Sequence, residues 1–388
     1  MKKQHNIPTG LFGFGTVNEG LYQLLEKTNN HSLDIQKIVV KSKNKARSIE
    51  NGKLSFEPND ILENDAIQLV IEAISDADAA YEIVTKAMHN GKDVITANKK
   101  MVASYYKELA EVQKLTGKKM FYEAAVCGGI PVIKTLDQYF TYDDISSIEG
   151  VFNGTANYIL SKMEEGSAYD DALKKAQDLG LAEADPTSDV EGWDAKYKLC
   201  ISHTHAFGKA VALEKVPNYG INTITATEQK FAEQNNCRIR LKASAKNGQF
   251  SVLPHFVSDD DYAYHLKGEA NYMEIKSKFA GNHILQGPGA GGFPTATALV
   301  SDIGLYQEDY EYQYSQSSSV DETTEEPSWF YVRGVDEKAL KEHTHEYIKN
   351  TAERETFYFI NLSLDKLVTI QPDFIGVVNS SIIKAVSA

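Results

Sequence analysis

The sequence IPTGLFGFGTVNEGLYQLL, residues 7–25, decides the fold expected for the first part of the chain. A short apolar run leads into a turn with three glycines, and an amphipathic helical pattern follows. Such a turn lets backbone N–H groups approach a pyrophosphate, whose charge the helix N-terminus favours. Asn18 stands where a third glycine of the usual motif is expected, and Pro8 removes one donor from the strand. On this motif alone, an ordinary tight turn is the alternative.

Strands and helices alternate in the residues that follow. Apolar strands are predicted at residues 35–40 and 66–75, and the helix after the second strand closes at Gly91. A helix is expected from Lys99 to about Leu115, followed by a strand in KKMFYEAAV. This alternation predicts a Rossmann-like, doubly wound parallel sheet. Ligands of such sheets bind at the carboxyl ends of the strands, which fall at residues 73–75, 96–99 and 123–129.

The segment after the second strand carries cations. Lys41, Lys43 and Arg47 occur there, and no acid appears before Glu50. An NAD-specific site places a carboxylate near this strand end for the ribose 2′-hydroxyl, whereas a cation accommodates the 2′-phosphate of NADP. The segment therefore favours NADP, with NAD as the alternative cofactor, and Lys41 is a candidate for cofactor binding. A solvated basic loop would have the same composition.

A second informative stretch, LAEADPTSDVEGWDAKYK, covers residues 181–198. It combines five carboxylates with two lysines, which is too much charge for a buried core. Its proline predicts a loop, and Ser188 followed by Glu191 predicts a capping box that starts a helix over residues 188–207. On that helix Glu191, Asp194 and Lys198 share one face, and Asp194 reaches Lys198 across one turn. Such a group suits a small zwitterion with a carbonyl, although a solvated helix face has the same pattern.

The composition restricts the partners and the compartment. The 388 residues include 40 lysines and arginines and 54 aspartates and glutamates, and the net charge of −14 argues against nucleic acid or an anionic membrane as a partner. Three widely spaced cysteines indicate neither a disulfide framework nor a zinc site, so a reducing compartment is expected. We find no signal peptide and no apolar run of membrane-spanning length. A cytoplasmic protein is expected.

The pattern changes after residue 222, where alternating strands joined by turns predict an antiparallel or mixed sheet, a natural dimer surface. The polar, acidic residues 308–327 are typical of a linker. The expected fold is α/β in several parts. These are a dinucleotide-binding domain at 1–135 completed by a helix at 291–305, a mixed α/β catalytic and dimerisation domain at 136–290, the linker, and a short α+β tail at 328–388.

Several motifs resemble segments of one enzyme family and occur in the same order. GLAEADPTSDVEGWDAKYKL is similar to the substrate loop and catalytic helix of homoserine dehydrogenase. TANKK, EAAVCGGIPVI, NGTAN and GPGAGG resemble further segments of that family, and the resemblance covers about residues 7–305. It implies NAD(P)H-dependent reduction of L-aspartate 4-semialdehyde to L-homoserine, on the route to threonine and methionine, by a homodimer. Many family members carry a C-terminal amino-acid-binding ACT module, of which residues 328–388 resemble a degenerate or partial copy.

The resemblance also implies roles for individual positions. Lys198 is the implied acid/base, with Lys99 as its partner and Asp194 beside it. The implied substrate contacts are Glu183, Asp189, Asn153, Gly154 and Thr155. The predicted cofactor contacts are Gly13, Phe14, Gly15, Thr16, Val17, Lys41, Ile74, Ser75, Lys99 and Gly291. A monovalent cation, sodium in the family, would bind Glu123, Val126, Gly128 and Ile130.

Two other functions are compatible with parts of the sequence. A cysteine-dependent phosphorylating semialdehyde dehydrogenase would use Cys127 as its nucleophile, but no histidine lies near that cysteine in the sequence. A non-catalytic NADP-binding regulatory protein would account for Asn18 and for the unusual tail. The presence of both Lys99 and Lys198 argues against that second alternative.

Overall fold

The computed structural model describes residues 6–30, 32–43, 45, 47, 49, 52–246, 248–315, 327–352 and 355–387. The chain divides into two compact units. Unit 1 comprises Met1–Tyr142, Cys200–Ala210 and Gly287–Gln316, and unit 2 comprises Asp143–Leu199, Val211–Gln286 and Ser317–Ala388. Within the described residues, no helix combines the length and the apolar character needed to span a bilayer.

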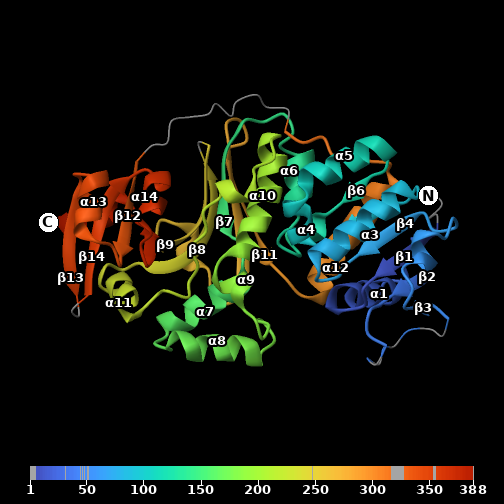
Figure 1. Ribbon diagram of the computed structural model, residues 1–388, viewed down its shortest axis with the longest axis horizontal. Coiled ribbons are helices and arrows are strands. Elements are labelled where there is room, and N and C mark those ends of the chain that lie inside the picture. Colours follow the sequence, from blue (N-terminus) through green and yellow to red (C-terminus); the bar gives the residue numbers. More distant parts are fainter. Residues whose placement is uncertain are drawn as a thin grey trace. The chain divides into compact units, whose positions relative to one another are not determined.

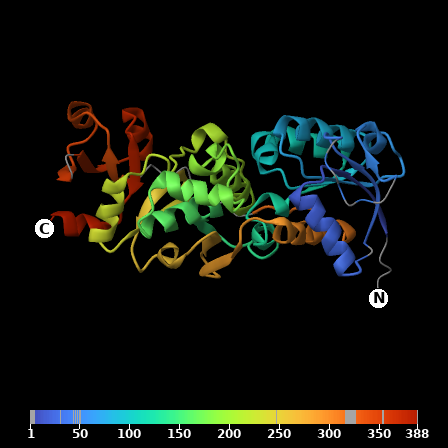
Figure 2. The same ribbon diagram turned by 90° about the horizontal axis from the view of Figure 1, so that it is seen from below.

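Unit 1 is built on a six-stranded sheet with the order β3-β2-β1-β4-β5-β6 (Figure 1). All of its strand pairs are parallel, so the predicted doubly wound, Rossmann-like fold is confirmed. The strands are β1 (Ile7–Phe12), β2 (Leu33–Val39), β3 (Leu54–Ser55), β4 (Leu69–Glu72), β5 (Asp93–Thr96) and β6 (Met120–Phe121). The helices are α1 (Thr16–Lys27), α2 (Asn59–Leu62), α3 (Ala77–His89), α4 (Lys99–Ser104), α5 (Tyr106–Thr116), α6 (Val132–Gln138) and α12 (Gly292–Gln307). Figure 2 shows α1 and α12 on one face of this sheet and α3 and α5 on the other.

The single helix expected from Lys99 to Leu115 is wrong, because the chain breaks between α4 and α5 at Tyr105. The Tyr105 ring stacks on Tyr81 of α3 with 4.3 Å between ring centroids. Its hydroxyl donates a hydrogen bond to the Asp78 carboxylate (2.6 Å). These contacts with a neighbouring helix outweigh the helical preference of the local sequence, which cannot reveal them.

Asn18 has a structural role that the glycine motif does not suggest. Its side chain is fully buried, and Nδ2 donates hydrogen bonds to the carbonyl oxygens of Phe12 (3.1 Å) and Gly13 (2.9 Å). The amide therefore ties the first turn of α1 to the end of β1. The close packing between helices occurs at Gly20 instead, two residues further along α1, where the backbone of Gly292 approaches.

Replacing Gly20 with alanine should destabilise unit 1. A methyl group at Gly20 would lie 2.6 Å from the carbonyl oxygen of Gly292, so one backbone must move. We expect the free energy of unfolding to fall by about 1–3 kcal/mol, the usual cost of overpacking. The matched control is Gly304→Ala on α12, where nothing lies within 4 Å of the added carbon. The free energy of unfolding of that variant should rise by about 0.5–1 kcal/mol, because alanine lowers the conformational entropy of the unfolded chain. Urea denaturation measures both, and equal stability of the two variants would contradict the packing argument.

Unit 2 contains a nine-stranded mixed sheet with the order β11-β10-β7-β8-β9-β15-β12-β14-β13 (Figure 1). Its strands are β7 (Ile145–Val151), β8 (Arg238–Lys246), β9 (Gln249–Val257), β10 (Ala270–Ser277), β11 (Asn282–Pro288), β12 (Ser328–Arg333), β13 (Tyr347–Ala352), β14 (Glu355–Leu362) and β15 (Phe374–Val377). Its helices are α7 (Gly154–Glu164), α8 (Tyr169–Asp178), α9 (Thr187–Val190), α10 (Trp193–Phe207), α11 (Ala226–Gln234), α13 (Glu337–His343), α14 (Leu364–Ile370) and α15 (Ser380–Ser387). The division into units places the last part of α10, from Cys200, in unit 1.

The tail at 328–388 is topologically complete rather than degenerate or partial. Its elements follow the order β12-α13-β13-β14-α14-β15, and its strands lie side by side as β15-β12-β14-β13. The neighbouring pairs within this set are antiparallel. This is the β-α-β-β-α-β arrangement of the ferredoxin-like fold. A single parallel pair, Val377 with His255, joins the tail to β9.

The first part of the predicted linker is packed against unit 1. Tyr310 donates a hydrogen bond from its hydroxyl to Asp137 (2.8 Å), and the Tyr314 N–H donates to the same carboxylate (2.9 Å). Tyr312 accepts one from the Tyr122 N–H (3.2 Å). The linker prediction is therefore wrong for residues 308–315, because alternate tyrosines anchor a segment whose composition is otherwise polar. Residues 316–326 lie outside the described part of the chain.

Candidate functional site

Lys198 is buried on α10, with 6% of its surface exposed. Its ammonium group donates hydrogen bonds to Asp194 Oδ2 (2.7 Å) and to the carbonyl oxygen of Phe152 (2.7 Å). That carbonyl also accepts a bond from Asn271 Nδ2 (2.8 Å). The predicted Asp194–Lys198 pair is therefore present, and its burial rules out a solvated helix face. Phe152 and Asn271 were not foreseen, because no local sequence pattern marks a carbonyl as a lysine partner.

Asn153 connects the pair to the acidic loop. Its Oδ1 accepts the N–H of Ala156 and so caps α7 (2.7 Å). Its Nδ2 donates to Asp189 Oδ1 (2.7 Å) and to Asp194 Oδ2 (2.8 Å). One amide thus holds two carboxylates together beside the Lys198 ammonium, so several charged groups converge at one place.

The helix predicted at 188–207 is two helices, α9 and α10, separated at Glu191 and Gly192. Gly192 has a φ of +84°, a conformation that ends the helical run. The capping box is also wrong, because α9 has no side-chain cap. Glu191 is the C-cap of α9 and precedes the first residue of α10, so it does not share a helical face with Asp194. Its carboxylate accepts the indole N–H of Trp193 (3.1 Å).

Glu183 stands apart from this network. Its side chain is exposed in the loop between α8 and α9, and its carbonyl oxygen accepts a bond from Gln177 Nε2 (3.1 Å). Thr155, by contrast, donates its hydroxyl to the Leu181 carbonyl (2.7 Å) and so attaches the start of the loop to α7. Gly154 lies beside Glu269, whose carbonyl oxygen would be 2.4 Å from an added Cβ.

In unit 1 the glycine turn leaves space before the N-terminus of α1. Gly13 has a φ of +83°, and an added Cβ would lie 2.8 Å from the Ala73 carbonyl oxygen. Gly15 is the N-cap of α1, and nothing lies within 4 Å of an added Cβ there. Phe14 is buried in the core, so only its backbone remains for a cofactor. Gly291, with a φ of +114°, is the N-cap of α12. The turn and helix end are suited to a pyrophosphate.

The carboxyl ends of β4 and β5 carry the next predicted positions. Ile74 is half-buried and Ser75 exposed, directly after β4. Lys99 is half-buried and is the first residue of α4. Asn98 caps that helix, because its Oδ1 accepts the Met101 N–H (2.9 Å). The two strand ends are adjacent in unit 1, since β4 pairs with β5.

The basic segment after β2 is partly organised by its own contacts. Arg47 donates from Nη1 to the carbonyl oxygens of Ser42 and Lys45 (2.9 Å each). Lys43 lies over the Phe56 ring, with Nζ 5.2 Å from its centroid. Lys41 is exposed next to the end of β2. Of the predicted cations, Lys41 is therefore the one best placed for an anionic ligand.

The predicted cation site lies in the turn before α6. Glu123 is buried, and its carboxylate oxygens accept the N–H groups of Ile133 (3.0 Å) and Lys134 (2.6 Å). Burial raises the pKa of this carboxyl to about 7. Cys127 and Gly128 both have positive φ, 53° and 49°, so the chain turns sharply here. Each carboxylate oxygen can accept a second partner, and backbone carbonyls are hard oxygen ligands, so the turn fits a monovalent cation.

Cys127 is fully buried. A nucleophilic cysteine needs access to its substrate and an environment that favours the thiolate. Burial therefore argues against the cysteine-dependent alternative. Among the residues that the structure describes, no group of three His, Cys, Asp or Glu side chains could hold a metal ion.

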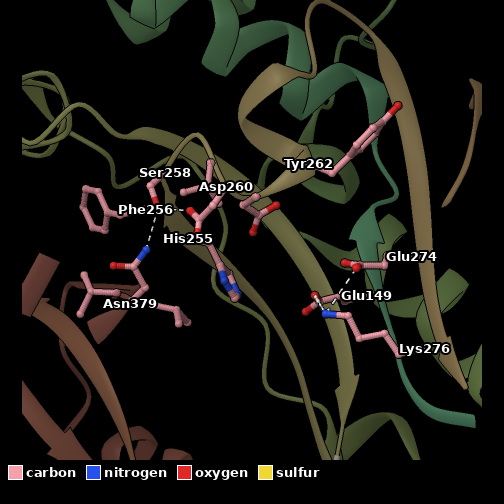
Figure 3. Close-up of a pocket in the computed structure, with 13 residues that line it drawn as sticks. Glu149, His255, Phe256, Ser258, Asp260, Tyr262, Glu274, Lys276 and Asn379 are labelled. Carbon is pink, nitrogen blue, oxygen red and sulfur yellow. Dashed lines mark hydrogen bonds and ion pairs between the residues drawn. The ribbon is translucent and has the colours of Figure 1, made fainter. Parts of the chain in front are cut away.

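A hollow of about 280 Å³ in unit 2 lies away from the predicted site residues (Figure 3). Its acids are largely satisfied by neighbouring groups, since Lys276 lies 3.6 Å from Glu149 and 3.3 Å from Glu274. At its other side Asn379 donates to the Ser258 hydroxyl (2.8 Å). None of the predicted catalytic or substrate residues lines it, so we do not assign the reaction to this hollow.

Comparisons with known proteins identify the family to which the chain is similar. A family model described as homoserine dehydrogenase matches residues 131–303, and one described as the homoserine dehydrogenase NAD binding domain matches residues 13–123. The homoserine dehydrogenase of Bacillus subtilis is 36% identical over 311 residues, which cover 76% of this chain and 72% of that protein. That of Neisseria gonorrhoeae is 35% identical over 310 residues, covering 76% and 71%.

Solved structures extend the similarity into the tail. A homoserine dehydrogenase from Thiobacillus denitrificans has a TM-score of 0.81 at 31% identity and covers 94% of both chains. The Staphylococcus aureus enzyme at pH 7.5 has a TM-score of 0.74 at 27% identity, covering 97% of this chain and all (100%) of that one. A hyperthermophilic archaeal homoserine dehydrogenase in complex with NADPH has a TM-score of 0.70 at 29% identity, with 80% and 100% coverage. The chain belongs to the homoserine dehydrogenase family and is an oxidoreductase with a Rossmann-type NAD-binding domain.

Proposed function

We propose that this chain reduces L-aspartate 4-semialdehyde to L-homoserine with NADPH, and that Lys198 donates the proton to the aldehyde oxygen. The observation that carries this assignment is the buried contact of Lys198 with Asp194 and Phe152. An ammonium group held by a carboxylate and a carbonyl has a fixed direction and costs no reorganisation when charge develops on a nearby oxygen. The same residue would accept the hydroxyl proton of homoserine in the reverse reaction.

The proton balance of the reaction determines the roles of the side chains. When bound, the reduced nicotinamide supplies a hydride to the aldehyde carbon. The carbonyl oxygen must then gain one proton, and the Lys198 ammonium is the proposed donor, with Lys99 as the second lysine of the reaction. Asp194 keeps the Lys198 ammonium oriented. Asn153 and Asp189 are proposed to bind the amino acid part of the substrate, because their hydrogen-bonding groups adjoin Asp194.

Glu183 lies outside the Lys198 network, and its exposed carboxylate is proposed to contact the ammonium group of the substrate. Glu183→Ala should therefore raise the KM for L-homoserine about tenfold and lower kcat less, because that charge-assisted contact is lost. Oxidation of L-homoserine with NADP by the purified protein, followed at 340 nm, tests this and the reaction itself. The matched control is Asp185→Ala, another exposed acid of the same loop, whose carboxylate accepts the Thr187 N–H (3.1 Å). Equal KM values for both variants would remove Glu183 from the substrate site. Absence of NADPH formation by the unmodified protein would refute the function.

We also propose sodium as a ligand of Glu123, Val126, Gly128 and Ile130. The support is a buried carboxylate in a sharp turn, where a cation would relieve the cost of burying that charge. Chloride salts of sodium and choline, compared at equal ionic strength, should give different melting temperatures. A sodium concentration of ~100 times Kd would add about 2.7 kcal/mol of stability. Identical melting curves in both salts would contradict the site.

A homodimer is proposed from the edge of the unit 2 sheet. β11 is the terminal strand of that sheet, and Ile284 on it and Phe279 just before it are exposed (39% and 73%). Exposed sheet edges with apolar side chains readily pair with another chain. Light scattering should therefore give twice the 43.1 kDa of one chain, and a mass of one chain at micromolar concentration would contradict it. The cytoplasmic location remains a prediction from the sequence.

A further inference from the structure

Glu72 is a fully buried acid at the last position of β4. Desolvation raises the pKa of its carboxyl to about 7. An apolar side chain of similar size would pack in such a place at lower cost, since a buried carboxyl loses its hydration. Its contribution must therefore be sought in the hydrogen bonds that it makes.

The Glu72 carboxyl connects the ends of two strands. Its Oε1 accepts the N–H of Ile74 (2.6 Å), in the turn that follows β4. Its Oε2 accepts the hydroxyl of Thr96 (2.5 Å), the last residue of β5 and the partner of Glu72 across the parallel pair. The Glu72 carbonyl oxygen also accepts the N–H of Ala97 (3.0 Å). Both turns at this edge of the sheet are thus tied to one residue.

Asn98 closes the connection from the opposite side. The Thr96 hydroxyl oxygen accepts the Asn98 N–H (3.0 Å), and Asn98 Nδ2 donates to the carbonyl oxygen of Ile74 (3.1 Å). Asn98 is also the cap of α4, through the Met101 N–H. Glu72, Thr96, Asn98 and Ile74 therefore form a ring of hydrogen bonds, and Lys99 follows directly from it.

We propose that Glu72 is a positioning residue for the reaction. It holds the turn at 73–75, with the cofactor position Ile74, at a fixed distance from the turn at 97–98, which Lys99 follows as the first residue of α4. Loss of the carboxyl would loosen the two turns, because Thr96 and Ile74 would each lose their acceptor, while the Asn98–Ile74 and Ala97–Glu72 backbone-carbonyl bonds would still join them. The inference rests on the proposed function, which assigns Ile74 to the cofactor and Lys99 to the reaction.

The test compares three variants. Glu72→Leu removes both acceptors at similar volume, Glu72→Gln keeps one amide oxygen, and Glu82→Gln alters an exposed glutamate on α3 as the control. NADPH affinity is measured by fluorescence, kcat and KM by homoserine oxidation, and the Ile74 and Met101 amides by hydrogen exchange. For Glu72→Leu we expect ~10-fold weaker NADPH binding, ~10-fold lower kcat and ~10-fold faster exchange, in line with the loss of charge-assisted bonds. Glu72→Gln should recover most of each quantity, and Glu82→Gln should match the unmodified protein.

Faster exchange in Glu72→Leu with unchanged NADPH affinity and kinetics would overturn the proposal, since Glu72 would then serve the fold alone. If Glu72→Leu does not fold, Thr96→Val removes one of the two side-chain bonds and gives a milder test. It should shift NADPH affinity and kcat in the same direction, and unchanged values would overturn the proposal. If the unmodified protein fails to oxidise homoserine, the proposed function fails, while NADPH affinity and amide exchange still decide whether Glu72 orders the two turns.

Discussion

Replacing Lys198 with alanine should lower kcat by a factor of about 10² to 10⁴, the usual contribution of a general acid/base. NADPH affinity should stay close to that of the unmodified protein, because the lysine belongs to the first part of α10 rather than to the glycine turn. Steady-state kinetics of homoserine oxidation and a fluorescence titration with NADPH measure the two effects. A near-normal kcat would mean that Lys99 or a water molecule, rather than Lys198, is the acid/base.

Folding must be separated from turnover in this experiment, because Lys198 and Asp194 form a buried pair. Removing one partner of such a pair costs about 3–5 kcal/mol, since the other charge remains buried. The double variant Lys198→Met, Asp194→Asn removes both charges and should regain stability while staying inactive. Lys196→Ala is the matched control. It lies on the same helix, is also buried, and donates to Asn218 Oδ1 (3.1 Å). A comparable loss of kcat in Lys196→Ala would show that helix damage, not chemistry, explains the result.

Apolar runs and periodicity were sufficient to predict most of the parallel sheet of unit 1, because most residues of β1, β2, β4 and β5 are buried, whereas the two-residue strand β3 was not predicted. They were insufficient wherever a distant contact decides the local conformation. Tyr105 breaks a helix through its stacking on Tyr81, and the segment after α12 is held by Asp137, more than a hundred residues earlier. The tail was underestimated for a related reason. Its short strands β13 and β15 carry little periodic signal and become recognisable only when paired in the sheet.

The candidate site shows the same division between local and distant information. The spacing of Asp194 and Lys198 predicted their contact, because one helical turn separates them. The partners from other elements, Phe152 and Asn271, had no signal in the sequence. In the sequence alone, Asn18 is an unexplained departure from the glycine motif, and its two hydrogen bonds to the turn provide the explanation. With that explanation, one of the two reasons for considering a non-catalytic protein no longer applies, and the complete tail removes the other.

Cofactor selection gives the second large expected effect. The unmodified protein should have a higher kcat/KM with NADP than with NAD, because the described residues after β2 offer Lys41 and other cations. The only acid considered there, Glu50, lies outside the described residues. Lys41→Ala combined with Arg47→Ala should erode the preference about 10- to 100-fold, the range expected when charge-assisted hydrogen bonds to a phosphate are lost. Kinetics with both cofactors at low ionic strength measure the ratio, since added salt screens exposed charges.

Single variants distinguish a direct contact of Lys41 with the 2′-phosphate from an effect of Arg47 on the conformation of the loop after β2. Arg47 donates hydrogen bonds to the Ser42 and Lys45 carbonyl oxygens. Arg47→Ala should therefore weaken NADP binding by loosening the loop that carries Lys41. Lys41→Ala should instead lower kcat/KM for NADP and leave that for NAD nearly unchanged, because NAD lacks the 2′-phosphate. Lys37→Ala is the control, a half-buried lysine of β2 whose Nζ donates to the Gly52 carbonyl (2.9 Å). A clear NAD preference in the unmodified protein would contradict the prediction, and a gain with NADP in Lys41→Ala would mean that the lysine occupies the phosphate position and blocks it.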